Sequence, residues 1–355
     1  MTFYTKIDQS IHPKAKNYLN KIKSVKSNVI NKKNSTIIKD IQNLYKKFDK
    51  PNEFGGTWEW IDKNKSKKIF AKTIKNYNEV SENFNNFFKN DLSYGITSSH
   101  WEKQTNKWKK KLASDILKNL DSWEEFVKEN DSDYKYLDSK NDSGNPFGLL
   151  YKKRLILYDK PRHDYYAKKI IDIFNNDKKI PLIVEVGGGY GGLLSQLIKR
   201  KFKFNYINID LNNSLLVNYY YIKTKHKNIN ISFKKKVNKN DFKKTDFIFV
   251  PFTSDIYKQI TLKADLIYNS NSFSEMNRGI LQKYFQLINK VLKPKYILHQ
   301  NSNILLYPKS KMHIEIQSEN FPIDRSKYKQ LYSGLSLFQG GSGRYREYLY
   351  QIIKN

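Results

Sequence analysis

The chain contains no cysteine among its 355 residues. That absence excludes disulfide bonds, zinc sites built from thiolates and every mechanism that needs a cysteine nucleophile. Long apolar runs are also missing, and short runs such as residues 180–186 and 247–252 fall far below the roughly 20 residues that span a bilayer. Because the first residues also lack the apolar stretch of a signal peptide, we expect a cytoplasmic protein without a transmembrane segment.

Arginine is scarce, although the formal net charge is +31. Only seven of the 65 basic residues are arginine, and lysine is spread along the whole chain, as an AT-rich genome would produce. Because arginine is the usual residue for binding phosphates and base edges, we expect no specific nucleic-acid partner. Contact with an anionic membrane surface or an acidic glycan stays open.

Helical periodicity dominates the first part of the chain. Apolar residues recur at helical spacing over residues 37–48 and again over 108–120. The segment DSKNDSGNP at 138–146 then indicates a loop and a domain boundary. We therefore predict a mainly helical N-terminal region over residues 1–150, which serves as a lid, an acceptor-binding region or an oligomerisation surface.

After residue 150, short apolar segments alternate with helical ones. Helices are predicted at about 163–174 and 280–292, and a glycine-rich turn and a tyrosine-rich strand close the chain. Strands are predicted in PLIVEV, FNYINID, NINISF, TDFIFVPF, ADLIYNS and KYILHQN. This alternation predicts an α/β fold over residues 151–355, with a Rossmann-like, mostly parallel sheet and an antiparallel last strand.

The central motif is EVGGGYGG at residues 185–192, between a predicted strand and a predicted helix. Glycine permits positive φ and lets a ligand approach the backbone, and the helix N-terminus offers free N–H groups. The spacing fits both the dinucleotide fingerprint and the GxGxG of methyltransferases. Glu185 before the first glycine favours a methyltransferase, and Asp210 at the end of the next strand can bind ribose hydroxyls. A structural role for Glu185, in which it accepts from loop N–H groups, stays open.

Three segments resemble the sugar O-methyltransferases associated with bacterial surface-polysaccharide gene clusters. They are VEVGGGYGGL at 184–193, FIFVPF at 247–252 and YNSNSFSEMN at 268–277. The chain departs from that family at Thr253, where the family often has a second proline. The resemblance implies a class I fold, S-adenosylmethionine as cofactor, and methyl transfer to a hydroxyl of a sugar nucleotide or glycan acceptor.

The predicted site residues follow from these motifs. The cofactor-binding set is Glu185, Gly187, Gly188, Gly189, Tyr190, Gly191, Asp210, Phe252, Asn269 and Asn271. The substrate-binding set is Arg162, His163, Phe273 and Met276, of which the first two lie on a helix that could reach the cofactor's carboxylate. No histidine or acid spacing typical of a metal site lies near these motifs, so we predict no metal.

A sugar hydroxyl is a very weak acid, so its methylation requires a catalytic base. Glu275 follows a predicted strand within NSNSFSEM, and His299 ends the neighbouring strand with a usual pKa suited to a base. Position favours Glu275, although it could instead cap the next helix or pair with Arg278.

Other functions remain open at this point. The segment NSNSF stands where amine methyltransferases commonly place NPPY, which favours a hydroxyl acceptor. The alternatives are a methyltransferase acting on RNA, lipid or a small metabolite, and a Rossmann-fold protein that binds NAD.

Overall fold

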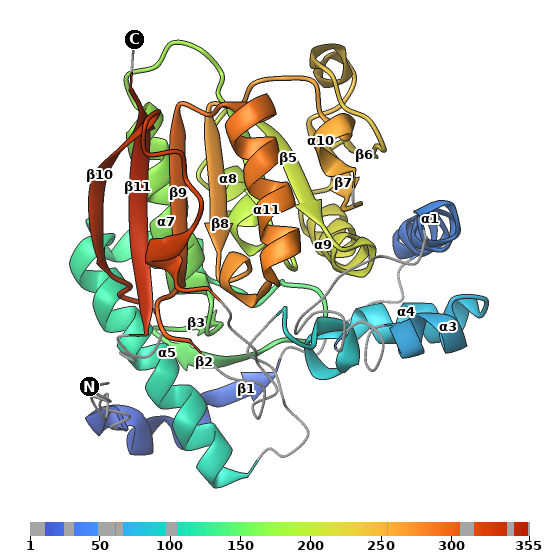
Figure 1. The fold of residues 1–355 in the computed structure, drawn as a ribbon. Helices are drawn as coiled ribbons and strands as arrows, with labels where there is room; N and C mark the ends of the chain where they lie inside the picture. Colours follow the sequence, from blue (N-terminus) through green and yellow to red (C-terminus); the bar gives the residue numbers. More distant parts are fainter. Residues whose placement is uncertain are drawn as a thin grey trace.

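The computed structural model describes residues 11–24, 32–48, 61, 67–96, 105–253, 255–305, 316–338 and 344–353. Its main feature is an eight-stranded sheet in the order β10-β11-β9-β8-β4-β5-β7-β6 (Figure 1). The strands are β4 (Leu182–Val186), β5 (Asn205–Asp210), β6 (Ile231–Phe233), β7 (Phe247–Pro251), β8 (Leu266–Ser270), β9 (Tyr296–Ser302), β10 (Tyr328–Leu335) and β11 (Tyr345–Ile352). Within this sheet β11 runs antiparallel to β9 and β10, and the other described pairs are parallel. The predicted α/β fold is therefore confirmed, including the antiparallel last strand.

Helices cover both faces of the sheet, because its central strands are apolar on both sides. One face packs against α7 (Lys160–Phe174), α8 (Gly192–Lys199) and α9 (Asn212–Lys225). The other packs against α10 (Ile256–Gln259), α11 (Arg278–Gln286) and its π-helical continuation η8 (Leu287–Leu292). Neighbouring residues alternate between the two cores, with Ile183 in the first and Val184 in the second. The short helices η6 (Lys239–Lys243), η7 (Phe273–Glu275) and η9 (Ser318–Asn320) lie in the connections.

The N-terminal region is mainly helical, as predicted, but it also contains a small antiparallel sheet in the order β1-β2-β3. Its elements are η1 (Pro13–Lys21), β1 (Ile22–Ser24), α1 (Lys32–Phe48), α3 (Lys67–Thr73), α4 (Tyr77–Asn85), η3 (Phe87–Lys89), η4 (Asp91–Ser93), α5 (Asn106–Phe126), η5 (Asp131–Asp133), α6 (Tyr134–Leu137), β2 (Phe147–Tyr151) and β3 (Arg154–Ile156). Helices α1, α3 and α4 share the core that contains α9, and Figure 1 shows them beside it. Helix α5 packs on η1 and the small sheet.

The predicted boundary at residue 150 falls inside the β2–β3 hairpin. The preceding loop is anchored rather than free, because Asp142 is buried within it. The Asp142 carboxylate accepts a hydrogen bond from the Tyr221 hydroxyl at 2.7 Å and pairs with Lys160 Nζ at 3.0 Å. Burial alone would raise the pKa of Asp142, but the ammonium groups of Lys160, Lys225 and Lys199 hold it well below its ordinary value. This buried network joins the N-terminal region to α7 and α9.

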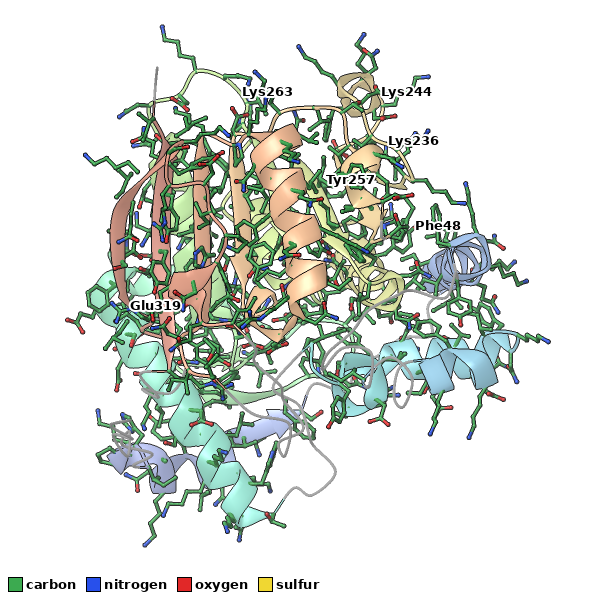
Figure 2. The ribbon with its side chains drawn as sticks, in the orientation of Figure 1. Phe48, Lys236, Lys244, Tyr257, Lys263 and Glu319 are labelled. Atoms are coloured by element: carbon green, nitrogen blue, oxygen red, sulfur yellow. The ribbon has the colours of Figure 1, made fainter. Side chains whose placement is uncertain are left out.

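The surface carries many lysine side chains, which Figure 2 shows extending outward. The labelled Lys236, Lys244 and Lys263 are exposed, and the last two precede strands β7 and β8. They therefore lie toward the opposite edge of the sheet from the carboxyl ends of these parallel strands. Within the described ranges, no helix combines the length and the apolar character needed to cross a membrane.

Candidate active site

The glycine motif forms the turn between β4 and α8, and its backbone requires glycine. Gly187, Gly189 and Gly191 have φ of +74°, +55° and +87°, in the left-handed region that side chains disfavour. A Cβ at Gly187 would lie 2.2 Å from Ser272 Oγ, so no larger residue fits there. The Gly187 N–H also donates to the Ile209 carbonyl at 2.9 Å, which fixes the loop against β5.

A pocket lies at this turn and contains about 1030 Å³ of space between protein atoms, part of it open to solvent. Its lining comprises Gly95, Ile96, Arg162, His163, Glu185, Gly187, Gly188, Gly189, Tyr190, Asp210, Leu211, Ser214, Phe252, Tyr268, Ser270, Asn271, Ser272, Glu275, Met276, Ile280 and Tyr284. The structure therefore brings most of the predicted site residues together at the carboxyl ends of β4, β5 and β8.

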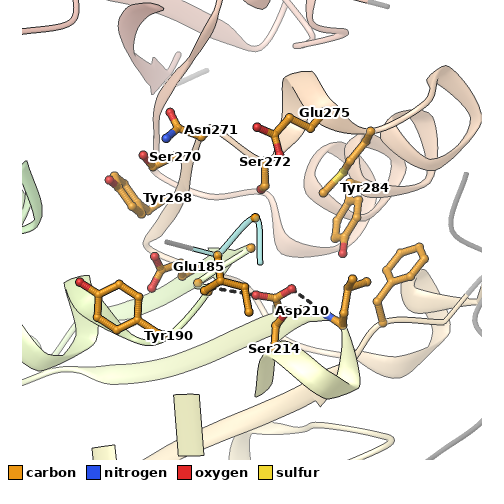
Figure 3. A pocket seen from close by; sticks show the side chains of 18 of the residues that line it. Glu185, Tyr190, Asp210, Ser214, Tyr268, Ser270, Asn271, Ser272, Glu275 and Tyr284 are labelled. Atoms are coloured by element: carbon orange, nitrogen blue, oxygen red, sulfur yellow. Dashed lines mark hydrogen bonds between the residues drawn. The ribbon is translucent and has the colours of Figure 1, made fainter. Parts of the chain in front are cut away.

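Asp210 ends β5 and lies on the floor of the pocket (Figure 3). Its carboxylate accepts hydrogen bonds from the Gly189 N–H at 2.9 Å and the Leu211 N–H at 2.7 Å. Burial raises the pKa of Asp210 to about 7, although these two N–H groups and the Ser214 hydroxyl oppose the increase. The glycine loop and the carboxylate are thus held together as one unit.

Glu185 is a second buried carboxylate in the same pocket, within β4 and below the glycine loop. The Tyr206 hydroxyl donates to its Oε2. Burial raises the pKa of Glu185 to about 7; the charge of Asp210 adds to the rise, while Tyr206 and Arg162 oppose it. Glu185 is therefore poised to ionise when a cation enters the pocket.

Arg162 and His163 reach the pocket from the first turn of α7. Arg162 donates to Ser270 Oγ at 2.9 Å and to Asp159 Oδ1 at 3.2 Å. Burial and the neighbouring Arg162 guanidinium hold the pKa of His163 well below its ordinary value, so its imidazole is neutral. This end of the pocket therefore presents a buried cation, Arg162, to the same space as Glu185.

The other end of the pocket is apolar. Phe252 after β7 and Tyr284 of α11 stack with their ring centroids 4.8 Å apart. Leu211, Met276 and Ile280 line the same pocket. An aromatic and aliphatic surface of this kind suits a flat heterocycle such as adenine.

The connection after β8 supplies the remaining polar groups. Asn271 has φ of +69°, a conformation that only a few non-glycine residues adopt, and it is followed by the short helix η7. Figure 3 shows Asn271 and Glu275 facing Asp210 and Glu185 across the pocket. Glu275 thus lies in the pocket lining on the side opposite the two buried carboxyl groups.

Four predicted residues lie outside the lining, and the assignments of two are corrected. His299 is fully buried, its ring stacks on Tyr348 and contacts Phe321, and burial lowers its pKa to about 3. Its ring nitrogens have no hydrogen-bond partner among the described residues, so this placement does not support a catalytic base. Phe273 is likewise a core residue, packed on Phe285 and Phe321, rather than a substrate contact.

The other two support the pocket from behind. Asn269 is buried and donates to the Val186 carbonyl at 2.7 Å and to Ser272 Oγ, which fixes the β8 connection against the glycine loop. Gly191 is the residue immediately before α8, and a Cβ there would lie 2.4 Å from Asn218 Oδ1. Both residues therefore position the site without facing it.

Sequence reasoning missed several lining residues. Leu211 directly follows Asp210 and Ser214 lies four residues after it, so their position after a predicted ligand-binding strand was a usable signal. Ile280 and Tyr284 are four residues apart in a predicted helix, but nothing indicated which of its faces met the pocket. Ile96 comes from the N-terminal region, and no local motif marks it.

Within the described part of the chain, no group of three or more histidine, aspartate or glutamate side chains is arranged to hold a metal ion. The polar groups of the pocket are carboxylates, amides and hydroxyls together with the Arg162 guanidinium and the His163 imidazole, which suit an organic ligand.

No family model matches the chain, and no curated protein matches it in sequence. Among solved structures, magnesium protoporphyrin IX methyltransferase from Synechocystis PCC 6803, with bound SAH, aligns with 53% of this chain and 83% of its own at 9% identity and a TM-score of 0.36. The glycopeptide N-methyltransferase MtfA, complexed with S-adenosylmethionine, aligns with 54% of this chain and 94% of its own at 9% identity and a TM-score of 0.35. Mitomycin 7-O-methyltransferase MmcR aligns with 55% of each chain at 12% identity and a TM-score of 0.37. These are similarities in fold over about half of the chain.

Proposed function

We propose that this pocket binds S-adenosylmethionine and that the protein transfers its methyl group to a hydroxyl of a sugar or glycan precursor. The observation that carries the proposal is the pair of opposite charges at one end of the pocket, Glu185 and Arg162. An amino-acid tail with an ammonium and a carboxylate group matches that pair. Asp210 between the two ends suits the ribose hydroxyls, and the apolar end around Phe252 suits adenine.

The same charges argue against a dinucleotide. A pyrophosphate at the glycine loop would bring negative charge beside Glu185 and Asp210, which are both buried there. The cofactor proposed here instead carries a sulfonium and an ammonium group, and both favour ionised carboxylates.

The choice of a sugar hydroxyl as acceptor is supported by the segment after β8. Residues 268–277 resemble those of sugar O-methyltransferases, and the structure places Asn271, Ser272 and Glu275 of this segment in the pocket lining. Amide, hydroxyl and carboxylate groups are suited to hydrogen-bond a polyhydroxylated ligand.

In this mechanism the bound cofactor supplies an electrophilic methyl group on a sulfonium sulfur. The pocket residues would orient the acceptor so that its hydroxyl oxygen faces the methyl group that the cofactor would supply. Glu275 accepts the hydroxyl proton as the bond between oxygen and carbon forms. The methyl ether, the neutral thioether and a protonated Glu275 result, so atoms and charge balance.

The proposal predicts the effect of Glu275→Gln, which preserves shape but removes basicity. We expect kcat to fall by about 10²–10⁴ with unchanged affinity for S-adenosylmethionine. The matched control is Glu319→Gln, which removes the same charge from an exposed position in η9 (Figure 2) and should leave kcat unchanged.

The measurement combines calorimetry with transfer assays. Calorimetry should show binding of S-adenosylmethionine and not of NAD, and mass spectrometry of incubated surface glycans should show the added mass of one CH2 group. Tight binding of NAD alone would overturn the cofactor assignment. A near-normal kcat in Glu275→Gln would remove the base assignment while leaving the cofactor assignment intact.

A further inference from the structure

Two of the chain's few arginines carry buried guanidinium nitrogens without a hydrogen-bond partner among the described residues. They are Nε of Arg162 and one terminal nitrogen of Arg344. A buried N–H group of a charged side chain without an acceptor is costly, so each such group calls for an acceptor from outside the described residues, such as a water molecule, an ion or a ligand. Arg162 lines the pocket, and the carboxylate of the proposed cofactor accounts for it. Arg344 requires a separate explanation.

Arg344 is fixed beside the connection that carries Glu275. Its carbonyl accepts from the Asn303 N–H at 2.7 Å, and its Nε donates to Ser302 Oγ at 3.2 Å. The Ser302 N–H donates in turn to the hydroxyl of Ser274, the residue before Glu275. The end of β9 thus holds the guanidinium and η7 on one scaffold.

The Arg344 guanidinium also lies over the ring of Tyr345, 5.3 Å from the ring centroid. Tyr345 begins β11 and pairs with Ser302 across the sheet. Burial raises the pKa of its hydroxyl, the charge of Glu275 raises it further, and Arg344 and Arg162 oppose the rise. Tyr345 therefore lies within the fields of the proposed base and of both guanidinium groups.

The charges that the proposed ligands bring to the pocket indicate the role of Arg344. The cofactor brings one carboxylate, and Arg162 is available for it. A guanidinium is a planar fork suited to phosphate and carboxylate, and this chain uses lysine for nearly all its other positive charges. An anionic acceptor approaching Glu275 would also be repelled unless a nearby cation offset that charge.

We propose that Arg344 binds an oxyanion on the acceptor, so that the acceptor is a sugar carrying a phosphate or a carboxylate. This inference rests on the proposed function, because it assigns the substrate class of the same site. The acceptor hydroxyl then lies at Glu275 while the oxyanion lies at Arg344.

The test uses the full chain loaded with S-adenosylhomocysteine and titrated by calorimetry at constant ionic strength. The probes are inorganic phosphate, acetate, glucose 1-phosphate, glucuronate and glucose. We expect the wild-type protein to bind at least one of the two simple anions at one site, and the matching sugar to bind better than glucose by about tenfold to a hundredfold. Binding of phosphate would indicate an acceptor that carries a phosphate, and binding of acetate would indicate one that carries a carboxylate.

Arg344→Gln should abolish the tighter binding of the charged sugar compared with glucose. Arg344→Lys should retain only part of it, because lysine lacks the planar, two-pronged guanidinium group. The control is Arg325→Gln, which removes the same charge where Arg325 packs over Tyr350 near the other end of β11. Absence of anion binding in the wild-type protein, or equal anion binding in Arg344→Gln, would overturn the inference. S-adenosylmethionine should bind all four proteins equally; failure to bind the wild-type protein would instead refute the proposed function.

Discussion

Cofactor binding to this pocket should be coupled to the release of protons. Glu185 and Asp210 both line the pocket, and burial raises the pKa of each to about 7. Ribose hydroxyls donate to an ionised Asp210, and a cationic ligand favours an ionised Glu185. Each carboxyl group that is protonated in the free protein must therefore lose its proton when S-adenosylmethionine binds. We expect the affinity to rise as the pH increases through 7.

The magnitude follows from the two pKa values. A carboxyl group with a pKa of about 7 is about nine-tenths protonated at pH 6 and about one-tenth protonated at pH 8. The loss of one proton on binding therefore makes the affinity about tenfold lower at pH 6 than at pH 8, or about 1.4 kcal/mol, and the loss of two makes it about a hundredfold lower. The stability of the free protein depends on pH in the opposite direction from the affinity. Because burial raises both pKa values above their unfolded values, these groups lower the free energy of unfolding as the pH rises from about 4 to 7.

Calorimetry in two buffers of different ionisation enthalpy counts the protons released. Asp210→Asn and Glu185→Gln each remove one titrating group, so each should reduce the number of protons released by up to one. Glu319→Gln, at an exposed position, should leave that number unchanged. Equal affinities at pH 6 and pH 8, or an uptake of protons, would refute the reasoning.

Two further predictions concern the framework around the site. Gly191→Ala should lower the free energy of unfolding, measured in urea, by about 1–2 kcal/mol or more. The reasons are that φ there is +87° and that a Cβ would lie 2.4 Å from the nearest side-chain oxygen. The control is Gly279→Ala, in open helical surroundings, which should not destabilise the protein. Asp142→Asn should lower the free energy of unfolding by about 3–5 kcal/mol, because the buried ammonium group of Lys160 would then have no carboxylate partner. Asp131→Asn, at an exposed position, is the control, and an unchanged urea midpoint in Asp142→Asn would contradict the role assigned to that network.

The large sheet could be predicted because each of its central strands carries its own apolar run. The small sheet could not, since β1 (Ile22–Ser24) and β3 (Arg154–Ile156) are three residues long and too short to show a period of two. The loop at 138–146 has the composition of a linker, yet Asp142 finds its partners on α7 and α9, far along the chain. Composition indicates local conformation but not which distant charges a loop will meet.

The site shows the same division between local and distant information. Gly187, Gly189 and Asp210 were predictable because the turn and the strand end define their positions within a few residues. Ile96 was not, since it reaches the pocket only after α4 and η3 pack their aromatic side chains against α9. Its contact depends on tertiary packing that no local pattern encodes.

The two candidate bases show where such a prediction fails. Both Glu275 and His299 were placed at the carboxyl ends of neighbouring strands. His299, however, lies three residues before the end of β9 and pairs with Asn269, so its direction is set by the pleat and by stacking on Tyr348 of β11. Glu275 lies five residues beyond Ser270, the last residue of β8, and is carried clear of the sheet by η7. A side chain in the middle of a buried strand, such as His299, faces one of the two cores, so we expect the reacting groups of such a sheet at the strand ends and in the connections that follow them.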